Sequence, residues 1–236
     1  FMVRRRPACG PKPYGGRRPG TPVSSTKQPG PASAQQHFTL QRVWDTAHDR
    51  LLAELPSVTP IVSGGFTSAF PAVSAEGDRA AIARGNAVEL YALPGGRLLR
   101  RIEHAAPVSA VAFAPMGRDL VSGAVDGSIL ITRDDGASRA FQAAAGIDVA
   151  ELLPDGRVVA GDAERRLRVF SPSGTVLADL EMPVRVMSLR REGSRLVALP
   201  SQWAAASPPL VVDVAHPRIV ARLEGHTGQV FSARWI

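Results

Sequence analysis

Five histidines are the residues of this sequence best suited to proton transfer or metal binding, because an imidazole titrates near neutral pH. They are His37, His48, His104, His216 and His226. None of them stands in a His-Glu-x-x-His pattern, and the single cysteine, Cys9, belongs to no cluster with the spacing of zinc ligands. The sequence therefore predicts no metal site and no cofactor.

The motifs of nucleophilic catalysis and nucleotide binding are also missing from the sequence. It contains no Gly-x-Ser-x-Gly turn and no glycine-rich loop that ends in Lys-Ser or Lys-Thr. We therefore predict that the protein is not an enzyme. The alternative is a site assembled from distant segments, for which Asp148, Glu151 and Arg185 are the titratable residues in otherwise apolar runs.

An internal repeat positions these residues. The segment "VWDTAHDRLLAEL", which starts at Val43, matches "VVDVAHPRIVARL", which starts at Val211, without gaps at seven positions. Between them, glycines end successive apolar runs every 37 to 40 residues, at Gly77, Gly117, Gly156 and Gly193. A fixed period of this length is typical of a repeat architecture.

Each repeat divides into four short runs that are rich in β-formers and separated by turn residues. In the clearest repeat these runs cover residues 108–114, 118–124, 128–133 and 138–143. Such runs predict four antiparallel strands. One small sheet cannot cover both of its faces, so it must stack on its neighbours, and radial stacking of four-stranded sheets gives a β-propeller.

Several repeat residues resemble the motifs of the WD-repeat (WD40) β-propeller family. Gly225-His226 and Trp44-Asp45 match its two signature dipeptides, while His104, Ser122 and Asp126 match three motif positions within one repeat. The tryptophan position is filled by Tyr91, Thr132, Phe170 and Val212 in the other repeats. The resemblance implies an all-β fold in which these motif residues are structural and hydrogen-bond in a line across each sheet.

The predicted domain boundaries follow from the repeats. Residues 1–37 are rich in proline and glycine, and we expect them to form a disordered basic tail. The propeller covers residues 38–236, with complete four-stranded blades at about 66–103, 104–143, 144–182 and 183–224, and partial blades at 38–55 and 225–236. Because both ends are partial and the chain begins with Phe1, we expect a truncated fragment of a longer protein.

Charge is distributed unevenly along the chain. The formal net charge is +7, but residues 1–37 contain seven basic residues and no acidic one, so the remainder is neutral. We therefore expect no nucleic-acid binding by residues 38–236, and the basic tail is the one part that could bind nucleic acid. No apolar run is long enough to cross a membrane, and we expect a cytoplasmic protein with no membrane association. Both lysines of the chain lie in the tail, so the remainder uses arginine in place of lysine, and it is rich in alanine. This composition indicates a bacterial source.

The resemblance implies a protein-interaction scaffold whose partner the sequence does not identify, and we expect no small-molecule substrate. Such propellers often serve as the sensing or regulatory module of a bacterial NTPase or Ser/Thr kinase. The loop at 200–210 is longer than its counterparts and contains Trp203, a residue type that is enriched at interaction hot spots. We predict that Trp203 contacts the partner. The alternative is a propeller enzyme with a central-channel site.

Overall fold

A computed structural model describes residues 38–45, 49–58, 61–62, 65–66, 71–200, 207–228, 230 and 233. The chain divides into two units, Phe1–Gln35 and Gln36–Ile236, and all described residues belong to the second. The predicted disordered tail at residues 1–37 and the predicted contact residue Trp203 lie outside the described residues.

Four four-stranded antiparallel sheets follow one another along the chain. The first contains β5 (Ala72–Val73), β6 (Arg79–Arg84), β7 (Ala87–Ala92) and β8 (Arg97–Glu103). The second contains β9 (Val108–Phe113), β10 (Leu120–Ala124), β11 (Ser128–Thr132) and β12 (Ser138–Gln142). The third contains β13 (Ile147–Leu152), β14 (Val158–Asp162), β15 (Arg166–Phe170) and β16 (Val176–Glu181), and the fourth β17 (Val186–Glu192), β18 (Arg195–Pro200), β19 (Leu210–Asp213) and β20 (Arg218–Arg222).

Two smaller sheets precede these four. One pairs β1 (Phe38–Asp45) with β2 (Arg50–Val58), as the sequence predicts, and the other pairs β3 (Ile61–Val62) with β4 (Gly65–Phe66), which the sequence did not indicate. The predicted strand within residues 225–236 lies mostly outside the described residues. Of that stretch, Val230 and Ala233 pack against the buried residues Val197, Leu199 and Val211.

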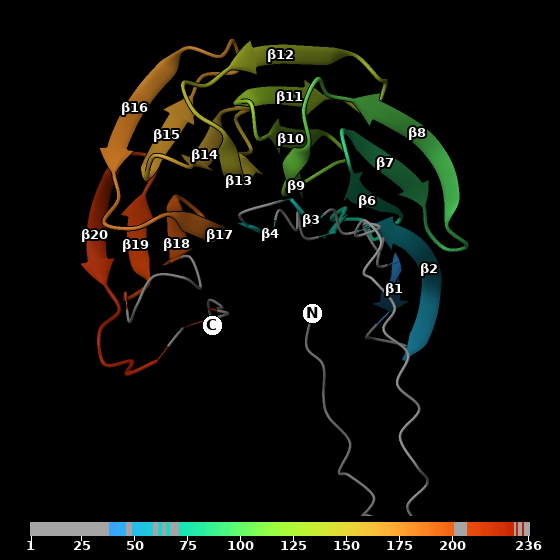
Figure 1. Cartoon of the computed structure of the whole chain (residues 1–236), viewed down its shortest axis with the longest axis horizontal. Coiled ribbons are helices and arrows are strands. Elements are labelled where there is room, and N and C mark those ends of the chain that lie inside the picture. Colours follow the sequence, from blue (N-terminus) through green and yellow to red (C-terminus); the bar gives the residue numbers. More distant parts are fainter. Residues whose placement is uncertain are drawn as a thin grey trace, which may run out of the picture. The chain divides into compact units, whose positions relative to one another are not determined.

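The sheets lie side by side in chain order, with their first strands adjacent. Strand β9 contacts both β6 and β13, and β13 in turn contacts β17. Figure 1 shows β9, β13 and β17 on the inner side, and β8, β12, β16 and β20 on the outer side. The described residues contain no helix, so the predicted all-β fold of repeated four-stranded sheets is confirmed.

Four of the five hydrophobic clusters of the described residues are shared by two neighbouring sheets. Leu55 of β2 packs with Ile82 of β6, and Val88 of β7 packs with Val108 of β9. Further along, residues of β9–β11 pack with β13–β15, and residues of β15 pack with β17–β19. The apolar face of one sheet is therefore buried by packing against the next sheet, and this burial drives the stacking.

Two glycines allow the inner strands to approach one another closely. A Cβ atom at Gly123 of β10 would lie 2.6 Å from Ile147 Cγ2, and one at Gly161 of β14 would lie 3.3 Å from Val186 Cβ. Ile147 and Val186 begin the first strands of the following sheets. The contact at Gly123 leaves no room for a side chain, whereas a side chain at Gly161 would require Val149 or Val186 to shift by a few tenths of an ångström.

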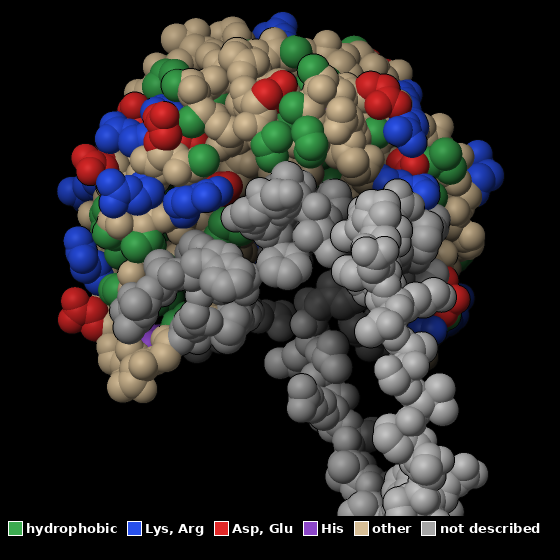
Figure 2. Space-filling model, in the orientation of Figure 1, with side chains coloured by type: hydrophobic (Ala, Val, Ile, Leu, Met, Phe, Trp, Pro, Cys, Tyr) green, Lys and Arg blue, Asp and Glu red, His purple; other side chains and the backbone are tan. Residues whose placement is uncertain are grey.

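Charged side chains of both signs are interspersed on the surface. Figure 2 shows arginine side chains next to carboxylates on the face in view, as the neutral composition of residues 38–236 predicts. Among the described residues, no helix has the length and hydropathy of a membrane span.

Candidate functional site

A hydrogen-bonded chain crosses the β9–β12 sheet at the predicted motif residues. His104 Nε2 lies 2.8 Å from Ser122 Oγ, and His104 Nδ1 lies 3.2 Å from Ser128 Oγ. The Ser128 hydroxyl donates to Asp126 Oδ1 at 2.7 Å, and the Ser128 backbone N–H donates to the same oxygen at 3.0 Å. His104 and Asp126 are thus connected through Ser128, so the chain fixes the turn between β10 and β11.

The tryptophan position of this sheet does not extend the chain. Thr132 is buried, and its hydroxyl lies 3.1 Å from Ser138 Oγ on β12, away from Ser122. In the first small sheet, Trp44 is 48% exposed and stands opposite Leu51, while Asp45 forms an ion pair with Arg50 at 3.7 Å. Trp44 and Asp45 therefore contribute to the pairing of β1 with β2.

Among the described residues, no such chain involves the remaining motif histidine. His226 is exposed, and its Nδ1 lies 3.3 Å from the carbonyl oxygen of Leu223. The residues that would follow it in a strand are largely outside the described part of the chain.

His104 makes the stability of the sheet depend on pH. Burial lowers the pKa of His104 from its usual 6.5, against an opposing effect of Asp126. Below pH 6.5 the unfolded chain binds this proton more readily than the folded one, so folding is weakened as the pH falls. We expect the unfolding free energy from urea titration to drop between pH 7.5 and 5.5 more in the wild type than in His104→Asn. An equal drop in both proteins would contradict this structural role.

An ion pair links the first strands of the third and fourth sheets. Arg185, directly before β17, donates from Nε to Asp148 Oδ2 of β13 at 2.7 Å, and from Nη2 to Asp148 Oδ1. Asp148 is nearly buried, whereas Arg185 is half exposed. The hydrogen bond that Arg185 donates to Asp148 raises the pKa of Arg185. Two of the three residues of the alternative composite site are thus engaged with each other.

The third of those residues, Glu151, has a different environment on β13. It accepts no hydrogen bond from the described residues, and burial raises its pKa to about 7, against the opposing charges of Arg190 and Arg191. A carboxyl group with this pKa exchanges a proton near neutral pH. The structure therefore does not bring Asp148, Glu151 and Arg185 into one cluster with shared hydrogen bonds.

A buried carboxylate lies on the first complete sheet. Glu89 of β7 accepts a hydrogen bond from the Tyr91 hydroxyl at 2.5 Å and pairs with Arg84 at 3.4 Å and Arg101 at 3.2 Å. Burial raises the pKa of Tyr91 to about 12, and the hydrogen bond to Glu89 adds to the effect. Strands β6, β7 and β8 all contribute, so the cluster ties together three strands of one sheet.

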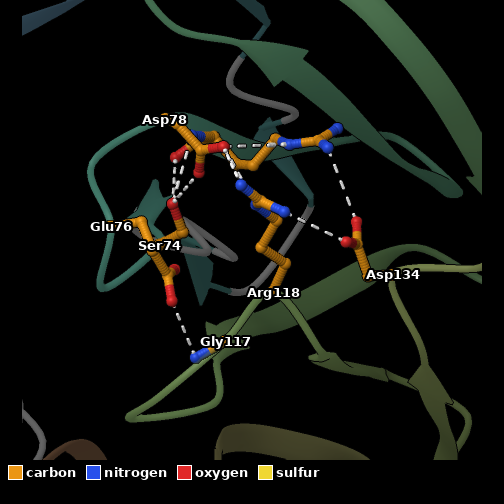
Figure 3. Close-up of polar contacts among 7 residues, drawn as sticks. Ser74, Glu76, Asp78, Gly117, Arg118 and Asp134 are labelled. Carbon is orange, nitrogen blue, oxygen red and sulfur yellow. Dashed lines mark hydrogen bonds and ion pairs between the residues drawn. The ribbon is translucent and has the colours of Figure 1, made fainter.

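A polar cluster on the loops joins the first and second complete sheets (Figure 3). Arg118 donates from Nε to Asp78 Oδ2 at 2.9 Å and from Nη1 to Asp134 Oδ2 at 3.3 Å. The Glu76 carboxylate accepts from the Gly117 backbone N–H at 3.0 Å. The hydrogen bond from Arg118 lowers the pKa of Asp78. These contacts fix the β5–β6 turn of one sheet against the β9–β10 turn of the next.

The chemistry of these clusters is structural. In the part of the chain that the structure describes, no three His, Cys, Asp or Glu side chains lie close enough together to hold a metal ion. The clusters instead pair donors with acceptors across strands and across sheets. Their effect is to set the positions of turns and of neighbouring sheets.

A family model described as "WD domain, G-beta repeat" matches residues 96–132. This stretch is similar to a WD repeat. It begins next to β8 of one sheet and ends with β11 of the following sheet, so the WD repeat in sequence is offset by one strand from the sheet in space. The repeated four-stranded sheets are consistent with a WD-repeat β-propeller. No curated protein matches the chain.

WD repeats imply a protein-interaction scaffold of the propeller type in general. The matched stretch contains all four residues of the hydrogen-bonded chain, His104, Ser122, Asp126 and Ser128. Sequence reasoning missed Ser128, although a serine two residues after Asp126 at the start of a strand is a recognisable turn signal. It also missed Glu89, which no motif position marks.

Proposed function

We propose that residues 38–236 are a non-enzymatic protein-interaction scaffold that serves as the sensing or regulatory module of a larger bacterial signalling protein. The module would act in the cytoplasm, on an NTPase or Ser/Thr kinase domain of the same protein. Support for this proposal comes from the WD repeat and from how the chain uses its buried polar groups.

The observation that carries the proposal is that the buried polar side chains are committed to the sheets. Among the described residues, these are Ser74, Glu89, His104, Ser109, Ser122, Thr132 and Asp162. Each of them is hydrogen-bonded to another group of the protein. Groups held in this way stabilise one conformation, and a rigid scaffold of stacked sheets is suited to presenting a surface to a partner.

The proposal is tested in the protein that the complete reading frame encodes. We expect deletion of residues 38–236 to change the activity of the adjacent NTPase or kinase domain by several-fold, and cross-linking in cells to join these residues to a protein partner. An unchanged activity together with no cross-linked partner would contradict the proposal.

Glu151 favours the second candidate function, a propeller enzyme with a central-channel site. It lies on β13, an inner strand, and its pKa of about 7 suits a general base. Turnover of a small substrate that is abolished in Glu151→Gln would support this candidate over the scaffold.

Glu151 also gives a stability prediction that holds for either function. The unfolded carboxyl has a pKa near 4.5, and the folded one about 7, so the folded chain keeps a proton that the unfolded chain releases between these values. Wild-type stability therefore falls as the pH rises through this window. We expect Glu151→Gln to be more stable than the wild type, by about 1 to 2 kcal/mol more at pH 8 than at pH 5.5.

Urea titrations of both proteins at the two pH values measure this difference. His104 acts with the opposite sign in the same range, which is why the variant is compared with the wild type at each pH. A stability gain that does not depend on pH would show that the Glu151 carboxyl titrates normally.

A further inference from the structure

A groove of about 320 Å³ opens between the second and third complete sheets, at the end where their first and second strands are joined. Its apolar lining comes from Ile131 of β11, Leu152 of β13 and Pro172, in the turn between β15 and β16. Leu152 belongs to the core shared by the two sheets, and Ile131 packs against that core. The floor of the groove is thus an accessible end of the inter-sheet core.

The two sheets hold the groove in a fixed shape. Arg139 Nη1 of β12 donates to the carbonyl oxygen of Pro172 at 3.1 Å, which bridges the sheets at the groove itself. Nearby, the rings of Phe141 and Phe170 meet with their centroids 5.2 Å apart. A Cβ atom at Gly174 would lie 2.5 Å from Phe141 Cβ, so the third sheet's turn is packed tightly against β12. A preformed apolar groove binds a ligand without first having to be ordered.

Arg133 gives the groove its charge. Its side chain is exposed beside the apolar lining and forms neither an ion pair nor a hydrogen bond with any part of the chain that the structure describes. Arg118 and Arg157, on the turns nearby, are both paired with carboxylates. Asp119 is the one carboxylate among the described residues of the lining, and its Oδ1 accepts the Asp134 backbone N–H at 3.1 Å.

The arginine is particular to this groove. Arg133 directly follows Thr132, which occupies the tryptophan position of its repeat. In the other three complete sheets, the residues that follow this position are Ala92, Ser171 and Asp213. The repeat therefore does not require a cation here, and Arg133 is free to serve a ligand.

We propose that this groove binds an extended segment of a partner protein in which an apolar side chain is followed by acidic residues. The apolar side chain packs on Ile131, Leu152 and Pro172, and a carboxylate pairs with Arg133, with Arg139 adding positive charge. Charge complementarity selects an acidic segment and disfavours the basic residues 1–37 of this chain. The inference rests on the proposed scaffold function and specifies the chemistry of its partner.

Fluorescence anisotropy with the whole 236-residue chain tests the groove. The probes are two fluorescein-labelled Gly/Ser dodecapeptides, one with a central Leu-Asp-Glu and the other with a central Leu-Lys-Lys. We expect saturable binding of the acidic peptide only. Arg133→Glu should weaken it about five- to tenfold, and Arg133→Gln by a smaller factor.

Arg97→Glu is the matched control, because Arg97 is an exposed arginine at the start of β8 that has no ion pair among the described residues. Equal affinity for both peptides would contradict the proposal that the groove binds an acidic segment. An equal loss of affinity in Arg97→Glu and Arg133→Glu would contradict it as well. If Arg133→Glu binds the peptide normally while residues 38–236 still regulate the adjacent domain, this inference fails and the scaffold function stands. If no regulation and no partner are found, the scaffold function fails.

Discussion

Replacing Phe170 with alanine is expected to lower the free energy of unfolding by about 3 to 5 kcal/mol. Phe170 is the largest fully buried side chain of the described residues, at 1% exposure, and occupies the tryptophan position of its repeat on β15. Its ring packs against Phe141 of the neighbouring sheet. The substitution removes apolar contacts within one sheet and at its boundary with the next, and the rigid strands leave a cavity.

Urea titration of the wild type and Phe170→Ala measures this loss. Met116→Ala is the control, since Met116 is 78% exposed and its removal should change stability by less than about 0.5 kcal/mol. A loss below about 1 kcal/mol in Phe170→Ala would mean that Phe170 does not pack between the sheets.

Gly123→Val is expected to destabilise the protein by about 3 kcal/mol, through overpacking. The backbone of Gly123 is one that other residues adopt, so the effect arises from the added side chain alone. Its Cβ would lie 2.6 Å from Ile147 Cγ2 and 2.9 Å from Ile147 Cβ, on the first strand of the next sheet. Either the inner strands must separate or Ile147 must leave its position.

A second substitution makes this prediction specific. Gly123→Val combined with Ile147→Ala frees the space that valine needs, so we expect the double variant to be more stable than the sum of the two single losses. Gly228→Ala, where no atom lies within 4 Å of the added methyl group, is the neutral control. Additive losses in the double variant would show that Gly123 and Ile147 are not in contact.

The strands of the best-defined repeat were predictable from sequence because alternation and turn residues specify them locally. Runs predicted at 108–114 and 128–133 became β9 (Val108–Phe113) and β11 (Ser128–Thr132). Stacking of the sheets was predictable as well, since no four-stranded sheet buries both of its faces alone. The short β3–β4 pair escaped prediction because two-residue strands carry no periodic signal.

Side-chain partners were less predictable than strands. The resemblance to WD repeats implied that His104, Ser122 and Asp126 hydrogen-bond in one line. The insertion of Ser128 depends on the distance that the turn sets between His104 and Asp126. The pairing of Asp148 with Arg185, and the groove beside Arg133, depend on how neighbouring sheets approach. Such contacts between repeats follow from three-dimensional packing and have no local sequence pattern. The role of Trp203 stays a prediction.

A double-mutant cycle between Phe141 and Phe170 tests most directly whether neighbouring four-stranded sheets pack face to face. The two residues lie on β12 and β15, in different sheets, and their rings meet across the boundary between these sheets. Unfolding free energies of the wild type, both alanine variants and the double variant should give a coupling of about 0.5 to 1.5 kcal/mol. Strictly additive losses would contradict the stacked arrangement.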